Sequence, residues 1–459
     1  MKRSSHGLSV KAAIIMISLG ICAPSRAQQA VVTPTAVIST TATSNRERLV
    51  SGQEQSAIFG TFVGSLGVTR GGEQGSLIGE YRLTFNQPLA EFGNEGQDNT
   101  SLEQDHSLRV GVSHRLTERL TLELGLEFFF GLQTLKLLVA PADALNDGVG
   151  DVGDGLDGAS ARSLTARNQI MSSETSGALK VAVTERDEAS LKLSLGWRRD
   201  FATKVLDGQQ IEAGDQEQAR DTFSTRALLG WGHDFTPMVT GEAQVGTSAA
   251  VFGTNDAFSR TFFAGVGARK TFNPSVSGRI SLGGALTRSE AQGETGQIEE
   301  ASLVSATAGA SLGIQRPMWL GALGYTRGIV ENGAVGDAQA TDDLSAELVW
   351  LYDPEVMLRG QAFGAASRSA FEVEGQANPV TLTYGAGAGA LVNLVDWLNL
   401  EVSYTFAGQF NPKDEADVIL GANAQDGFLK IHTVLVGFSA RTLLTPQGRA
   451  LNEAQGEAR

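Results

Sequence analysis

The sequence predicts an all-β fold: a transmembrane, antiparallel, up-and-down β-barrel of about 18 strands. Three observations lead to this prediction. Apolar and polar residues alternate from about residue 31 to residue 441, long and short connections between the alternating segments take turns, and aromatic residues sit beside the short connections. Alternation with a period of two is typical of strands, whereas the spacing of amphipathic helices is hardly present.

The first 27 residues have the order of a secretory signal peptide. Lys2 and Arg3 precede an apolar run from Ala12 to Cys22, and small residues end this segment at Ala27, where we expect cleavage. The run is too short to span a bilayer. A lipoprotein signal is the alternative, but Ile21 stands before Cys22, where such a signal has a small residue. We therefore expect a signal peptide at 1–27, a barrel at 28–441 and a polar periplasmic tail at 442–459.

Composition excludes several classes of function. The chain has 36 Lys and Arg against 51 Asp and Glu, and loss of residues 1–27 removes four bases and no acid, so the net charge falls from -15 to -19. Such an acidic chain is a poor binder of nucleic acid. The single cysteine, Cys22, leaves with the signal peptide, so the mature chain can form neither a disulfide nor a thiolate metal site.

The clearest alternation runs from Leu120 to Phe128, where every second residue is Leu or Phe and the residues between them are polar or Gly. Leu191–Trp197 and Leu398–Phe406 repeat this pattern. In a strand, successive side chains point to opposite faces. Each of these segments therefore predicts a strand with one apolar and one polar face.

The connections between these segments predict the strand count. Eight short turns alternate with nine long polar connections, which implies 18 antiparallel strands with both chain ends on the periplasmic, short-turn side. The short turns are expected near 70–74, 117–119, 186–188, 236–237, 273–275, 315–317, 353–355 and 395–396. The long connections are expected near 43–55, 88–103, 135–169, 204–220, 252–258, 289–300, 331–341, 368–379 and 411–427.

Aromatic residues next to short turns are typical of the girdle that lies at a membrane interface. Soluble sandwiches and propellers also have alternating strands. A sandwich does not require long and short connections in strict rotation, and a propeller would require a fixed repeat, which the sequence does not show. Aromatics that simply end hydrophobic strands are the alternative explanation. The expected interface aromatics are Phe235, Phe272, Trp319, Tyr352 and Trp397.

The polar faces of the strands predict the lining of a water-filled lumen, because a barrel of this size has room for water inside. A lumen with charges of both signs would favour anionic or polyhydroxylated solutes. The alternative is that these residues only solvate and brace the wall. The candidate lumen residues are Arg82, Arg109, Glu123, Glu127, Lys192, Arg198, Arg226, Arg269, Arg279, Arg359 and Glu401.

Three other kinds of site are disfavoured. The Asp- and Gly-rich run at 146–158 could ligate calcium or close the pore as a loop, but its spacing matches no calcium motif. The row Gly385, Gly387 and Gly389 has the two-residue spacing of a strand face and not of a phosphate loop. Ser113 and His114 are adjacent and so point to opposite faces, and no catalytic triad can be assembled. We expect no enzyme, no metal and no cofactor.

In layout, the chain resembles the outer-membrane barrel porins found beside exopolysaccharide genes in Gram-negative bacteria. The resemblance rests on the early strand Val32–Thr41, the pair Ile58–Thr69 and Leu77–Phe85, and the terminal strand Phe428–Ala440. Barrels of this kind usually end on an aromatic residue, whereas here a polar tail follows Phe438.

The resemblance implies a channel for small hydrophilic solutes in the outer membrane. An exit barrel for a secreted exopolysaccharide and a structural or adhesive barrel are the alternatives. The partners expected are outer-membrane lipid and lipopolysaccharide, the outer-membrane assembly machinery and, for the exit barrel, a periplasmic polysaccharide export complex.

Overall fold

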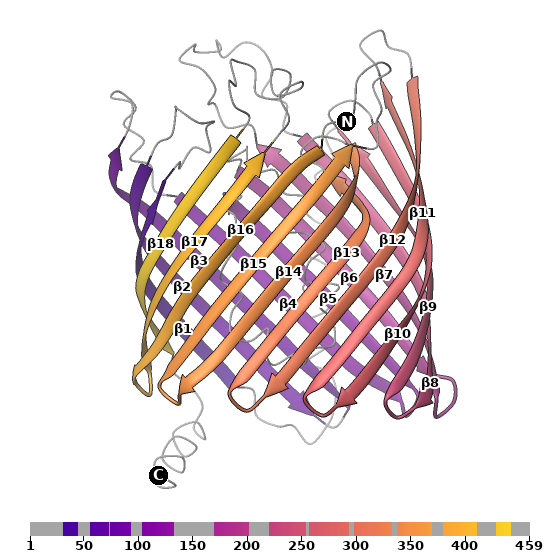
Figure 1. Cartoon of the computed structure of the whole chain (residues 1–459), viewed down its shortest axis with the longest axis horizontal. Helices are drawn as coiled ribbons and strands as arrows, with labels where there is room; N and C mark the ends of the chain where they lie inside the picture. Colours follow the sequence, from indigo (N-terminus) through magenta and orange to yellow (C-terminus); the bar gives the residue numbers. More distant parts are fainter. Residues whose placement is uncertain are drawn as a thin grey trace.

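The computed structural model contains one closed antiparallel barrel of 18 strands, which confirms the predicted fold class (Figure 1). It describes residues 31–44, 56–72, 74–92, 103–132, 169–201, 220–253, 257–292, 298–332, 337–369, 380–410 and 428–441. Within these ranges no helix is long and apolar enough to cross a membrane. The expected signal peptide, the polar tail and the acidic run at 146–158 lie outside the described residues.

The first nine strands are β1 Val31–Thr43, β2 Ser56–Gly72, β3 Gly75–Phe92, β4 Glu103–Thr117, β5 Leu120–Leu132, β6 Gln169–Ala182, β7 Asp187–Phe201, β8 Arg220–Thr236 and β9 Val239–Phe252. The last nine are β10 Ala257–Asn273, β11 Val276–Gln292, β12 Ile298–Arg316, β13 Trp319–Asn332, β14 Asp337–Asp353, β15 Val356–Ser369, β16 Val380–Val395, β17 Leu398–Phe410 and β18 Phe428–Arg441. Each strand pairs with its neighbours in the sequence, so the connections never cross.

The barrel closes where β1 pairs with both β2 and β18. At this seam the Thr43 and Thr433 hydroxyl groups lie 3.4 Å apart, and the Ser44 backbone N–H donates to the His432 carbonyl at 2.8 Å. Closure leaves no unpaired sheet edge, which is what a lipid environment requires of a β-structure.

All eight short turns lie at the same end of the barrel (Figure 1). Seven of them match the predicted positions, whereas the turn between β6 and β7 covers 183–186 and so precedes the predicted 186–188. The predicted long connections, in contrast, are too wide in four places, because the flanking strands continue past the expected ends. The connections span 93–102, 253–256, 293–297 and 333–336, and the last three separate their strands by only four or five residues. Polar residues such as Glu290 and Glu300 remain in register there, and no apolar alternation marks these strand extensions.

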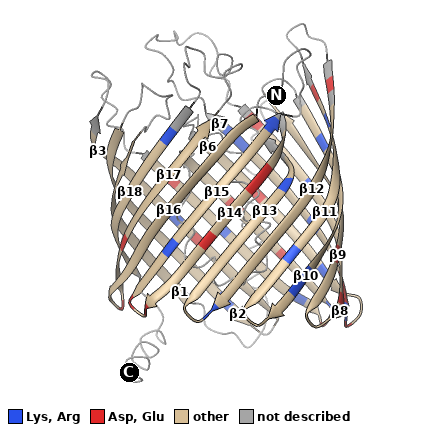
Figure 2. Cartoon of the chain, viewed as in Figure 1, with Lys and Arg blue, Asp and Glu red and all other residues tan. Residues whose placement is uncertain are grey.

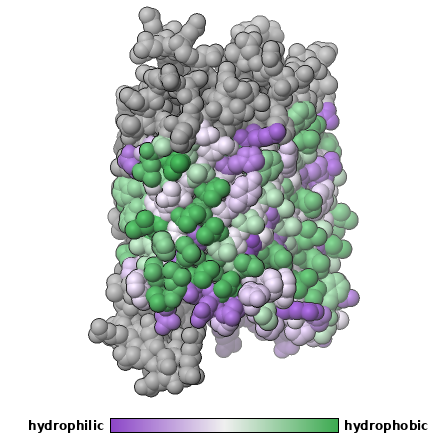
Figure 3. All heavy atoms as spheres, turned by 60° about the vertical axis from the view of Figure 1, so that its left-hand side comes forward, coloured by the Kyte–Doolittle hydropathy of each residue, from purple (hydrophilic) through white to green (hydrophobic). Residues whose placement is uncertain are grey.

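The two faces of the wall differ in chemistry. Cross-strand partners share a face, and the registers carry one set of residues from strand to strand around the barrel. One set is rich in exposed large apolar residues, such as Leu193, Val266, Leu282 and Val304. Figure 3 shows apolar side chains of this kind spread over the outer surface. The barrel therefore has an apolar outer face, and the alternate residues face inward.

Candidate functional site

The inner wall carries all 11 candidate lumen residues. Lys192, for example, lies between Leu191 and Leu193, which are exposed on the outer face. The registers link the inward rows across strands: Arg109 is opposite Glu127, and Arg269 is opposite Arg279. Figure 2 shows acidic and basic residues spread over many strands. The structure thus places Arg82, Arg109, Glu123, Glu127, Lys192, Arg198, Arg226, Arg269, Arg279, Arg359 and Glu401 on the inner face.

Two ion pairs join neighbouring strands on this wall. Arg109 Nε lies 2.9 Å from Glu127 Oε1, and both side chains are more than half exposed. Lys180 Nζ donates to Glu123 Oε1 at 2.8 Å. Exposed pairs of this kind each contribute about 0–1 kcal/mol to stability. The sequence interpretation missed Lys180, although its position between Leu179 and Val181 follows the alternation.

Two further pairs reach across an intervening strand at a glycine. Arg279 on β11 lies 2.7 Å from Glu242 on β9, and Gly267 of β10 is the residue opposite Glu242. Arg359 on β15 pairs with Glu401 on β17, across Gly389 of β16. A Cβ atom at Gly389 would stand 3.1 Å from Arg359 Nε. A side chain at this position would therefore require the Arg359 side chain to shift from its path to Glu401.

The glycine row of β16 faces inward as one line, because its residues pair with the inward row of β15. The Phe363 ring lies over Gly385, where a side chain would collide with it. A similar arrangement exists at Gly246, against which the Phe263 ring packs, and Arg226 lies 5.3 Å from the centre of that ring. The inward glycines thus make room for aromatic and basic side chains along the wall.

Arg269 differs from the paired cations. Its side chain is exposed on the inner wall, directly opposite Arg279, whose own charge is balanced by Glu242. No ion pair or hydrogen bond joins Arg269 to another residue in the described ranges. Among the described residues, Arg269 is thus an inward positive charge without an ion-pair partner.

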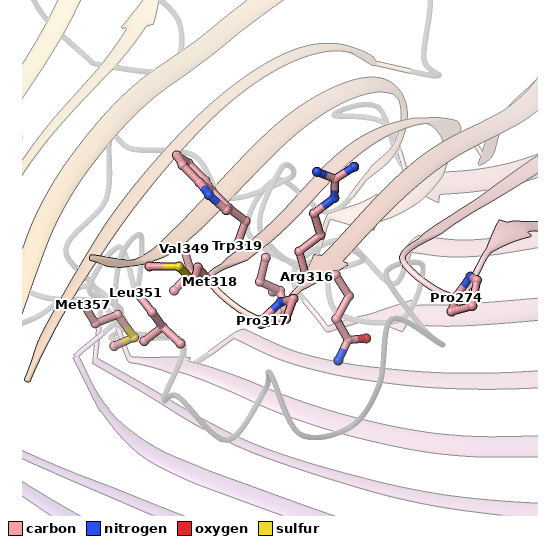
Figure 4. Close-up of a pocket in the computed structure, with 10 residues that line it drawn as sticks. Pro274, Arg316, Pro317, Met318, Trp319, Val349, Leu351 and Met357 are labelled. Atoms are coloured by element: carbon pink, nitrogen blue, oxygen red, sulfur yellow. The ribbon is translucent and has the colours of Figure 1, made fainter. Parts of the chain in front are cut away.

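The short-turn end of the barrel has a hollow whose lining mixes apolar side chains with Gln315 and Arg316. This hollow of about 600 Å³ opens beside the turns that follow β10, β12 and β14, and apolar side chains form much of its lining (Figure 4). Val349, Leu351 and Met357 are among these residues. The sequence interpretation missed this region, because Leu348–Tyr352 is apolar at every position and shows no alternation.

The five expected interface aromatics all lie at the short-turn end and are exposed. Trp319 stacks on Trp350 with ring centres 4.9 Å apart and an angle of 6° between the ring planes. Lys270 lies 5.1 Å from the ring centre of Phe272. The first contact stacks two indole rings, and the second places an ammonium group near a phenyl ring.

A second set of outward aromatic residues was not recognised in the sequence. The Tyr81 hydroxyl lies 2.9 Å from His106 Nδ1, and the Tyr404 hydroxyl lies 2.8 Å from His432 Nδ1. Both histidines stand near the strand ends that face the long connections. The alternation gives these residues an outward direction, but only the registers bring each tyrosine to its histidine.

His, Asp and Glu side chains are spread over many strands in the described part of the chain. No group of three or more His, Cys, Asp or Glu side chains in these ranges is placed to hold a metal ion. His233 lies 2.8 Å from Asp187 Oδ1, on the outer face near the short turns. Ser113 and His114 occupy successive strand positions and so face opposite sides.

No family model and no curated protein sequence matches this chain. Among solved structures, it is similar to OccAB2 of Acinetobacter baumannii at 10% identity and a TM-score of 0.43, covering 91% of this chain and 98% of that one. It is similar to the FrpB iron transporter of Neisseria meningitidis at 8% identity and a TM-score of 0.45, covering 90% and 81%. It spans 63% of the copper transporter OprC, at a TM-score of 0.41, 11% identity and 85% coverage of this chain. These likenesses carry no argument about function.

Proposed function

We propose that this chain is a porin-like channel of the Gram-negative outer membrane that passes small hydrophilic solutes through a charged lumen. The observation that supports this most is the contrast between the two faces of one closed wall. Exposed Leu, Val and Phe side chains cover the outside, and acidic, basic and hydroxyl-bearing side chains line the inside. A wall of this kind separates an apolar surrounding from a watery interior.

The size of the barrel supports a water-filled interior. Eighteen strands spaced about 4.8 Å apart and tilted about 40° give a backbone cylinder with a radius of roughly 18 Å. Side chains alone do not fill a cylinder of that width. The mixed charges of the inner wall hydrate polar solutes, so selection in such a channel depends on size and electric field and needs no chemical turnover.

Reconstitution of the refolded protein into planar bilayers tests the proposal. We expect stepwise conductance, together with swelling of proteoliposomes in solutions of small sugars and a loss of swelling as the sugars become larger. Vesicles without protein are the first control, and heat-unfolded protein is the second. Folded protein that inserts but gives no conductance would refute the channel, and an impermeable structural barrel would then be the better description.

A further inference from the structure

Two arginines face outward side by side near the end of the barrel where the long connections lie. Arg260 is the fourth residue of β10, Arg288 is the fifth residue from the end of β11, and the register makes them direct partners. Arg260 lies next to Phe262 on the outward row of β10, and Arg288 lies next to Leu286 on the outward row of β11. Both arginines are exposed.

Among the described residues, no acid balances the charges of these two arginines. No ion pair joins Arg260 or Arg288 to another residue in the described part of the chain. Their Cα atoms are about 4.5–5.5 Å apart as direct partners, and like charges so placed repel each other. The nearest outward carboxylates, Glu290 and Glu300, form the next row toward the long connection, and neither lies within ion-pair distance of an arginine.

Other outward arginines at this end do have an acidic partner. Arg199 holds Asp221 through two hydrogen bonds of 2.7 and 2.6 Å, and Arg327 lies 3.6 Å from Asp342. The pair Arg260 and Arg288 is therefore distinguished by both its juxtaposition and its lack of a counter-ion. Small residues stand on either side of it, Ala249 on β9 and Ser302 on β12, so that a ligand has room to approach.

The surroundings of the pair fit an amphiphile. Below the arginines, toward the middle of the barrel, the outward surface is apolar and includes Val266, Leu282 and the highly exposed Val304. The Arg260 guanidinium carbon lies 4.4 Å from the ring centre of Phe262, which holds the charge at the upper edge of this surface. Guanidinium groups bind phosphate oxygens through paired hydrogen bonds. Acyl chains on the apolar surface would bring a phosphate head to the arginines.

We infer that Arg260 and Arg288 together bind the phosphate group of a lipid in the outer leaflet, of the phosphorylated glycolipid class. This inference rests on the outer-membrane placement under the proposed function. The ligand is a lipid rather than free phosphate, because the two arginines lie directly above an apolar surface. The phosphate supplies the missing counter-ion and removes the repulsion between the two arginines.

Native mass spectrometry of the full detergent-solubilised protein tests the site, with bisphosphorylated lipid A as the probe. The test variant is Arg260→Gln/Arg288→Gln. The matched control is Lys270→Gln/Arg316→Gln, which removes two outward cations from the short-turn end. We expect the test variant to bind lipid A at least about tenfold more weakly than the native chain, because charge-assisted hydrogen bonds are lost. The control should bind as the native chain does.

Three results would overturn the site: equal lipid A binding by the test variant, equal binding of dephosphorylated lipid A by the native chain, or displacement of lipid A by inorganic phosphate at similar concentration. The single variant Arg288→Gln, checked for strand content by circular dichroism, provides a second test if the double variant fails to fold. Conductance is measured on the same preparations. A native chain that binds lipid A but does not conduct refutes the channel and leaves the lipid site in place.

Discussion

We expect the field inside the lumen to depend on Arg269, because its charge has no ion-pair partner in the described ranges. The change Arg269→Gln removes one positive charge from the wall and leaves every ion pair of the wall intact. We expect it to raise the permeability of the channel to cations relative to anions.

The magnitude follows from Coulomb's law. For an ion passing about 10 Å from the guanidinium in water, one unit charge contributes about 0.4 kcal/mol, screened to about 0.3 kcal/mol at 10 mM salt. Cations and anions change in opposite directions, so their permeability ratio shifts by about 2.7-fold. At 0.1 M salt the same arithmetic gives about 1.7-fold, and at 1 M the shift disappears.

Reversal potentials in a KCl gradient across a planar bilayer measure this ratio. The matched control is the double variant Arg279→Gln/Glu242→Gln, which removes the neighbouring ion pair without changing the net charge. We expect it to leave the ratio nearly unchanged. An unchanged ratio in Arg269→Gln at 10 mM, or an equal shift in the control, would refute the assignment of the lumen field to Arg269.

Three more predictions concern the wall. Leu282→Arg on the outer face should lower the stability of the folded barrel in lipid by about 2–4 kcal/mol. Ser281→Arg on the inner face, between Gly267 and Gly309, should lower it by less than about 1 kcal/mol. Urea titration measures both, and equal losses of stability would contradict the face assignment. Gly389→Val should lower stability by about 1–3 kcal/mol, because the valine side chain obstructs Arg359. Gly111→Val is the control, because a side chain there meets only open space inside the barrel. Equal unfolding midpoints for the two variants would show that glycine is dispensable at position 389. A double-mutant cycle on Arg359 and Glu401 should give a larger coupling energy than one on Arg109 and Glu127. Because the Arg109–Glu127 pair is exposed, its coupling energy should be below about 1 kcal/mol. A smaller coupling energy for the less exposed pair would contradict this ranking.

The sequence could predict the strands and their faces because both depend on local periodicity. The alternation from Leu120 to Phe128 determines which residues share a face, and the turns after Thr117 and Thr236 are visible as breaks in it. The strand extensions at Glu290 and Glu300 could not be predicted, because backbone pairing there continues through polar residues with no apolar face. The hollow near Leu351 was missed for the opposite reason, since both faces of Leu348–Tyr352 are apolar and show no alternation.

The candidate site was predictable only one residue at a time. Alternation gives Arg359 and Glu401 an inward direction, but they are 42 positions apart, and only the register across β16 brings them together over Gly389. The same holds for Arg279 and Glu242 across β10. A list of inward charges therefore does not give the field inside a barrel. Where a cation meets a carboxylate across the wall, the two stiffen the wall and contribute little field. We expect the field to come from residues such as Arg269, which the register places opposite a like charge. The same reasoning on the outer face leads to Arg260 and Arg288, for which we propose a lipid phosphate as the counter-ion.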